Sequence, residues 1–216
     1  MATFSMAGDR NYEQRHANME LNPRPIQLEG LHVRLEPLAI SHAAPLYAAY
    51  CLDPSVWQYL TVAPPISEAA MLAMIETQLA AQDQGRLIPF AQVAVRSGMA
   101  VGVTTFMNIS AQDRGLEIGG TWLGRPYQRS GINTEAKYLL LRHAFEYLYA
   151  VRVQLKTDGR NLQSQRAIER LGATREGVLR KHMLSQHCFI RDTVMYSIID
   201  SEWPIVKERL ERMLGA

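Results

Sequence analysis

The sequence is poor in the features that mark secreted, membrane-spanning and metal-binding proteins. Its two cysteines, Cys51 and Cys188, lie far apart and without clustered histidines, which argues against a metal site and favours reduced thiols. No apolar run approaches the roughly 20 residues that cross a bilayer. The polar first residues lack the apolar centre of a signal peptide. We therefore expect a cytoplasmic protein with no membrane segment and no metal.

A surplus of charge of one sign is also lacking. Lys and Arg number 23 and Asp and Glu 21, which gives a formal net charge of +2, with no block of like charges. Nucleic acids and membrane surfaces are bound by concentrated basic patches, so neither partner is expected. The remaining composition, 47% hydrophobic and 20% charged over 216 residues, is that of a globular protein with one domain.

The apolar pattern predicts one α+β (mixed α/β) domain over residues 28–216, preceded by a polar arm at residues 1–27. The arm has no period, so we expect it to be flexible or ordered by a partner. The expected strands are 31–38, 89–95, 99–109, 116–123, 151–157, 173–180 and 188–199. The expected helices are 41–50, one that Ser67 caps, 134–148, 161–171 and 202–214.

The most informative segment joins the strand at 116–123 to the helix that follows it. A helix start leaves backbone N–H groups without intrahelical partners, and the helix dipole favours an anion there. Gly131 allows close approach of a bulky phosphate, and Arg129 adds positive charge. The loop has neither the ending of a nucleotide-triphosphate loop nor the three-glycine spacing of a dinucleotide fold. These residues alone leave open a coenzyme A site and a simple turn with a solvated arginine.

Longer strings around this loop are similar to those of GNAT N-acetyltransferases. The run Gln128-Arg-Ser-Gly131-Ile-Asn133 follows the acetyl-CoA motif Gln/Arg-x-x-Gly-x-Gly/Ala, with Asn133 in place of the last small residue. GINTEAK, LLRHAFE, NLQSQRAIERLGA and RDTVMYSI resemble the RimJ/RimL-type branch, and the similarity extends from about Leu28 to the C-terminus. The resemblance implies a twisted, mostly antiparallel sheet of about seven strands, flanked by helices and splayed between the fourth and fifth strands.

The resemblance also implies acetyl-CoA as co-substrate, with no metal. Its pantetheine arm would lie in the splay and bond the backbone of the fourth strand, in which Gly119 and Gly120 indicate a bulge. The expected cofactor-binding residues are Thr121, Trp122, Leu123, Gln128, Arg129, Ser130, Gly131, Ile132, Asn133, Thr134, Asn161 and Ser164.

Glu117 is the first catalytic candidate. Several family members carry a general base at this place, and the amine must lose a proton before it can attack a thioester. A strand glutamate that faces solvent or pairs with an arginine is the alternative interpretation. Glu176 and His182 are lesser candidates.

Ser164 is the second catalytic candidate. Many family members place a tyrosine seven positions after the residue equivalent to Asn161, where it protonates the departing thiolate, but this chain has Ile168 there. Ser164 then remains as the hydrogen-bond donor. A helix serine that bonds back to a carbonyl, and an asparagine that only caps its helix, are the structural alternatives.

The acceptor side is less well marked. Trp57 and Tyr59 fall where family members form the acceptor pocket, although such aromatic residues also fill cores. Arg191 and Asp192 are expected to pair across the last strands. The resemblance implies direct acetyl transfer in a ternary complex to a primary amine, either a protein N-terminus or a small molecule, and a homodimer is frequent in the family. The missing tyrosine leaves open a coenzyme A-binding sensor or assembly protein with weak catalysis.

Overall fold

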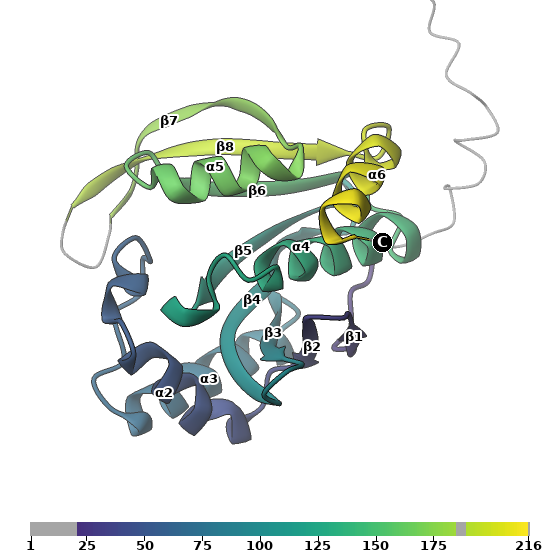
Figure 1. Cartoon of the computed structure of the whole chain (residues 1–216). Helices are drawn as coiled ribbons and strands as arrows, with labels where there is room; N and C mark the ends of the chain where they lie inside the picture. Colours follow the sequence, from purple (N-terminus) through teal and green to yellow (C-terminus); the bar gives the residue numbers. More distant parts are fainter. Residues whose placement is uncertain (1–20, 185–188, 216) are drawn as a thin grey trace, which may run out of the picture.

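The computed structural model describes residues 21–184 and 189–215, and a single eight-stranded sheet organises them (Figure 1). The strand order is β1-β2-β3-β4-β5-β6-β8-β7, and β5 with β6 is the parallel pair in this otherwise antiparallel sheet. The strands are β1 (Leu28–Glu29), β2 (Val33–Pro37), β3 (Leu87–Ala94), β4 (Met99–Ser110), β5 (Gly115–Leu123), β6 (Arg152–Asp158), β7 (Thr174–Leu184) and β8 (Ile190–Ile199).

Helices cover both faces of this sheet. The α-helices are α2 (Ala43–Cys51), α3 (Glu68–Asp83), α4 (Ile132–Arg142), α5 (Leu162–Leu171) and α6 (Trp203–Leu214). Short 3-10 turns are η1 (Ile40–His42), η2 (Pro54–Trp57) and η3 (Arg125–Tyr127), and a π-helical turn, η4 (His143–Tyr147), extends α4. The expected order of elements is confirmed. No helix among the described residues is long and apolar enough to span a membrane.

The first expected strand is shorter than predicted, and the sheet has eight strands instead of about seven. A turn at Gly30 separates β1 from β2, and the carboxylate of Glu135 on α4 holds that turn. It accepts hydrogen bonds from the backbone nitrogens of Leu31 (2.8 Å), His32 (2.6 Å) and Val33 (2.8 Å). A Cβ on Gly30 would lie 2.3 Å from the Glu135 carboxyl carbon, so a side chain there would displace this clamp.

Two apolar clusters form the core, one on each face of the sheet. The larger packs α4, α5 and α6 against strands from β2 to β8, with Leu140, Val153 and Tyr196 fully buried. The smaller packs α2, η2 and α3 against β3, β4 and the end of β5. The helices α2 and α3 therefore cover the β3–β5 half of their face, as Figure 1 shows below the sheet.

The N-terminal arm is only partly described. Its residues 1–20 lie outside the described residues. Within the remainder of the expected arm, the Leu21 side chain is 2% exposed and belongs to the larger core cluster, and Ile26 packs against that cluster. The packed part of the chain thus begins before residue 28.

Candidate active site

The strands β5 and β6 separate in the middle of the sheet. Their pairing runs from Gly115 with Arg152 to Glu117 with Gln154 and stops there, although β5 continues to Leu123. Beyond this fork, residues 118–123 pair with β4 on one side and with no described strand on the other. The expected splay between the fourth and fifth predicted strands is therefore confirmed, and it leaves one backbone edge of β5 open to a ligand.

A bulge bends β5 just past the fork. The register between β4 and β5 shifts between Val103 and Thr105, and Gly120 adopts a left-handed φ of 58° opposite this shift. Such a bulge turns the strand and increases its twist. The pair Gly119 and Gly120 thus marks the position at which β5 leaves β6.

The loop that follows β5 presents an uncapped helix start. Gly131 is the N-cap residue of α4, with φ 85° and ψ −26°, and no described side chain caps this helix. A Cβ at Gly131 would lie 3.3 Å from the His32 ring, so both conformation and space favour glycine. Arg129 is also left-handed, with φ 60°. Two left-handed residues therefore turn the chain before α4, whose first N–H groups have no intrahelical acceptors.

Glutamine side chains connect this loop to α5. The Gln128 Nε2 donates to the carbonyl of Leu123 (3.1 Å), and the Gln163 Nε2 donates to the Gln128 Oε1 (3.0 Å). Asn161 caps α5, because its Oδ1 accepts from the Ser164 nitrogen (3.0 Å). The structure thus brings the two predicted segments, at residues 128–134 and 161–164, to the same end of the sheet.

The side chains of the predicted cofactor loop differ in exposure. Arg129 and Ser130 are exposed, and the Ser130 hydroxyl donates to the Tyr127 carbonyl. Ile132 is buried in the core, and the buried Thr134 hydroxyl accepts from Arg170 on α5 (2.9 Å). The side chains of Ile132 and Thr134 therefore serve packing, and only their backbone groups are candidates for contact with a phosphate.

Glu117 lies buried at the fork, with 1% of its surface exposed. Its Oε2 accepts hydrogen bonds from Asn108 (2.8 Å) and Gln154 (3.0 Å) and forms a salt bridge with Lys156 at 3.0 Å. Side chains from β4 and β6 thus hold one carboxylate oxygen in a fixed position. The cationic partner of Glu117 is Lys156 and not an arginine, and the sequence pattern gave no indication of Lys156.

A second buried charge lies under the bulge of β5. The Lys137 side chain of α4 is 5% exposed and donates to the hydroxyls of Thr121 (2.6 Å) and Thr104 (3.0 Å). These hydroxyls also bond each other at 2.8 Å. Burial lowers the pKa of Lys137 to about 7. Thr121 was predicted to bond the cofactor through its backbone. Its side chain is held by Lys137 of α4, the helix that follows the predicted cofactor loop.

The other two predicted strand contacts have partners on their carbonyls. The carbonyl of buried Trp122 accepts from Gln92 on β3 (3.1 Å), and that of Leu123 accepts from Gln128. Gln92 also bonds the Val103 carbonyl (3.0 Å). These bonds stabilise the irregular part of the sheet that faces the gap.

The two predicted acceptor residues have different environments. Trp57 is 3% exposed and packs against the rings of Tyr50 and Trp122 at 5.3 and 5.0 Å between centroids. Tyr59 is half-buried, and its carbonyl accepts from Arg191 on β8 (3.4 Å). The structure brings Tyr59, and not the Trp57 ring, to the charged residues at the end of β6.

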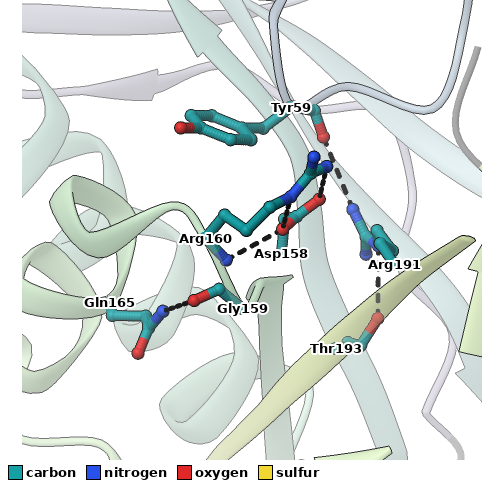
Figure 2. Close-up of polar contacts among 7 residues, drawn as sticks. All are labelled: Tyr59, Asp158, Gly159, Arg160, Gln165, Arg191 and Thr193. Atoms are coloured by element: carbon teal, nitrogen blue, oxygen red, sulfur yellow. Dashed lines mark hydrogen bonds and ion pairs between the residues drawn. The ribbon is translucent and has the colours of Figure 1, made fainter. Parts of the chain in front are cut away.

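Those charged residues surround Asp158, the last residue of β6 (Figure 2). Arg160 donates to its Oδ1 from Nε (3.0 Å) and to its Oδ2 from a terminal nitrogen (2.8 Å). The Arg160 guanidinium also lies 3.7 Å from the Phe189 ring centroid. Asp158 and Arg160 line an open depression of about 400 Å³ between the start of α5 and the strands β7 and β8.

Glu176, a lesser candidate for the base, is engaged elsewhere. Hydrogen bonds from Arg152 lower its pKa to about 2, with a further contribution from Ser197, against the opposing effect of burial. A carboxylate with so low a pKa is poorly matched to accept a proton near neutral pH.

The open edge of β5, the uncapped start of α4 and the carboxylate at the fork belong to a GNAT fold, since a solved GCN5-related N-acetyltransferase from Brucella melitensis is 30% identical with a TM-score of 0.86 and covers 93% of this chain and 90% of its own. The model of the acetyltransferase (GNAT) domain family matches residues 32–174. The chain therefore belongs to this family and is an N-acetyltransferase by its family.

Individual relatives agree with this assignment. A solved structure from T. thermophilus, described as a candidate acetyltransferase, is 44% identical with a TM-score of 0.79 and covers 89% of this chain and 98% of its own. A candidate ribosomal N-acetyltransferase of Bacillus subtilis, YdaF, is 31% identical over 49% of this chain and 57% of its own length. Mycobacterium smegmatis RimJ in complex with CoA-disulfide shares the fold, with 22% identity, a TM-score of 0.76 and coverage of 88% and 95%. These names agree with the RimJ/RimL-type branch that the sequence strings resemble.

Proposed function

We propose that this protein transfers the acetyl group of acetyl-CoA directly to a primary amine in a ternary complex. The observation that carries the proposal is the end of β5–β6 pairing at Glu117, which places a buried carboxylate at the closed end of an open strand edge. The activated acetyl group comes from the bound thioester. The chain's own residues hold the two substrates together and manage the protons.

The phosphate groups would be held at the loop of residues 128–133. The N–H groups at the start of α4 and the positive end of its dipole supply the binding energy, and the exposed Arg129 adds charge. Gly131 fits this role because its backbone is left-handed and a Cβ there would lie 3.3 Å from the His32 ring. The open edge of β5 at residues 118–123 would bond the pantetheine arm as an added strand bonds a sheet.

Glu117 would accept the proton of the acceptor's ammonium group, directly or through a water. Its Oε2 is fixed by three partners from two strands, which keeps the carboxylate aligned without a large loss of freedom at each turnover. Ser164 would donate a hydrogen bond to the departing sulfur from the start of α5. Its neighbour Asn161 already holds the Ser164 backbone in place.

The acceptor would be a primary amine, either a protein N-terminus or a small molecule. The protein acceptor is favoured by the ribosomal relative from Bacillus subtilis, whose name refers to that class of substrate. A coenzyme A-binding protein without transfer activity is the competing outcome, and it would bind the cofactor yet form no product.

The test compares wild type with Glu117→Gln, which retains the acceptor oxygen for Asn108 and Gln154 but cannot take a proton. Acetylation of peptides and small amines is followed by mass spectrometry, and coenzyme A binding by calorimetry. We expect kcat to fall by about 10²- to 10⁴-fold while the Kd for coenzyme A stays within about threefold. The same assay on Ser164→Ala tests the donor role of that residue.

The matched control is Glu176→Gln, which removes a carboxylate that faces Arg152 on the same sheet but lies outside the proposed site. It should leave kcat unchanged. Equal turnover of wild type and Glu117→Gln would exclude Glu117 as the base. Binding of coenzyme A without product from any amine would instead favour the competing outcome.

A further inference from the structure

The sheet face at Glu117 carries two carboxylates that already have cationic partners. Glu117 is paired with Lys156 at 3.0 Å, and Asp158 with Arg160 at 2.8 Å. Burial acts to raise the pKa of Asp158, but hydrogen bonds from Arg160 bring it below its usual value. Each carboxylate therefore already has one cation as its partner.

Arg191 of β8 interacts electrostatically with both of these pairs but has no such match. Arg191 is 6% exposed, and it forms no salt bridge with any described carboxylate. Its Nε donates to the Thr193 hydroxyl at 3.2 Å and a terminal nitrogen donates to the Tyr59 carbonyl at 3.4 Å, both neutral acceptors (Figure 2). The expected pairing of Arg191 across the last strands is thus wrong. Asp192, by contrast, does reach across, because it accepts from the Lys181 nitrogen on β7.

This arrangement is costly for the isolated protein. Burial lowers the pKa of Arg191, whereas the charges of Asp158 and Glu117 act to raise it and that of Arg160 to lower it. A guanidinium nevertheless keeps its proton in proteins. The pairs Glu117–Lys156 and Asp158–Arg160 each match one carboxylate with one cation, so Arg191 is left without a carboxylate of its own among the described residues. A buried charge without a counterion is costly, and a ligand of opposite charge would offset that cost.

The position of Arg191 on the sheet indicates whether the acceptor or the cofactor would supply the opposite charge. Arg191 and Thr193 of β8 alternate with Val194, which packs into the core on the α5 face, so they lie on the opposite face. Thr193 pairs with Asp158 of β6, which lies on the same face as Gln154, the partner of Glu117. The unmatched charge thus shares its face with the carboxylate proposed to deprotonate the acceptor, and not with the phosphate loop.

We propose that Arg191 is the specificity residue for the acceptor and binds a carboxylate carried close to the reactive amine. This inference rests on the proposed function. Arg191 presents a planar guanidinium, which suits bidentate recognition of carboxylates. The carboxylate could be the α-carboxylate of a free amino acid or the side chain of an acidic residue next to a peptide N-terminus, and the shared chemistry is an amine with a nearby carboxylate.

The experiment measures kcat/KM for two matched pairs of acceptors with wild type. One pair is alanine and alaninamide, and the other is the dipeptide amides Ala-Glu and Ala-Gln. We expect the carboxylate member of at least one pair to be preferred by about tenfold or more. The pair that shows the preference identifies the source of the carboxylate. Ratios near one in both pairs would overturn the proposal without reference to any variant.

Arg191→Gln should abolish that preference while kcat/KM for the neutral member changes by less than about threefold. Arg191→Lys should retain part of the preference, because lysine keeps the charge but lacks the planar guanidinium. Arg180→Gln, which removes an exposed arginine of β7, is the matched control and should leave the ratio unchanged. An equal loss of kcat/KM for both members in Arg191→Gln would show that Arg191 only supports the Tyr59 loop.

Calorimetric binding of the same acceptors to the coenzyme A complex gives a readout that does not depend on turnover. A preference for the carboxylate member that disappears in Arg191→Gln supports the inference even if no product forms. Absence of product with every amine would overturn the proposed function instead, so the two failures are distinguishable. Should Arg191→Gln fail to fold, as judged by circular dichroism, the wild-type ratios and Arg191→Lys decide the question.

Discussion

The two halves of the sheet face that carries Glu117 differ sharply in what covers them. Over β3 to β5, the helices α2 and α3 bury an apolar cluster that includes Trp57 and Trp122. Over β6 and β8, the same face carries Gln154, Lys156 and Arg191, and no helix among the described residues adds an apolar cluster there. The first half buries apolar side chains, and the second half holds polar and charged groups, which we propose serve the acceptor.

The largest expected effect tests the apolar half. Trp57→Ala should lower the free energy of unfolding by about 3–5 kcal/mol, because it leaves a cavity between Tyr50 and Trp122 and removes the bond to the Val62 carbonyl. Denaturant unfolding measures this change. Val62→Ala, at a 52% exposed position, is the control and should cost less than about 0.5 kcal/mol.

Trp57 was also predicted as an acceptor contact, and the same variant tests that prediction. If Trp57 acts only in the core, the KM for the acceptor should stay within about threefold at a temperature where the variant is folded. A large rise in KM with little loss of stability would show that the division between the two halves is wrong.

Lys137 is a buried charge on the opposite face of the sheet, where α4 packs. Its folded-state pKa is lowered to about 7 by burial, so the unfolded chain binds more protons than the folded one between about pH 7 and its usual value near 10.4. This residue should therefore make the protein more stable as the pH rises through that window, by up to about 1.4 kcal/mol per pH unit. Below about pH 7 both states are protonated, and its unfavourable contribution is constant.

Lys137→Met should remove that pH dependence, because Thr104 and Thr121 can still bond each other. The measurement is urea unfolding of both proteins from pH 7 to 10, in which the difference between the two slopes isolates Lys137. Lys181→Met, at an exposed position, should keep the wild-type slope. Identical slopes for wild type and Lys137→Met would mean that Lys137 is not desolvated as the structure indicates.

Much of the fold was predictable because local signals and packing agree. Ser67 caps α3 through a bond to the Ala70 nitrogen, and Asn161 caps α5, both as their positions before apolar periods indicated. Gly131 and the paired glycines of β5 marked the loop and the bulge, because the left-handed backbone of Gly131 and Gly120 is unfavourable for other residues. These features depend on a few neighbouring residues, which the sequence displays directly.

The buried charges were not predictable in the same way. Lys137 was missed although it precedes Leu140 and Leu141 by three and four positions, a spacing that places it on the buried face. For Arg191, alternation with Val194 could indicate the face but not the absence of a carboxylate partner. That absence depends on which cations Glu117 and Asp158 engage, and strands distant in the sequence determine it. The placement of the cofactor residues remains a prediction.

Hydrogen exchange with and without coenzyme A tests the central claim, that the cofactor occupies the open edge of β5 and the start of α4. Amide exchange at residues 118–123 and 132–134 should slow by at least about tenfold when saturating coenzyme A is added, because those N–H groups gain acceptors. Exchange along β7, at residues 174–184, should not change. Protection confined to β7, or none at 118–123 and 132–134 despite saturated binding, would contradict the account.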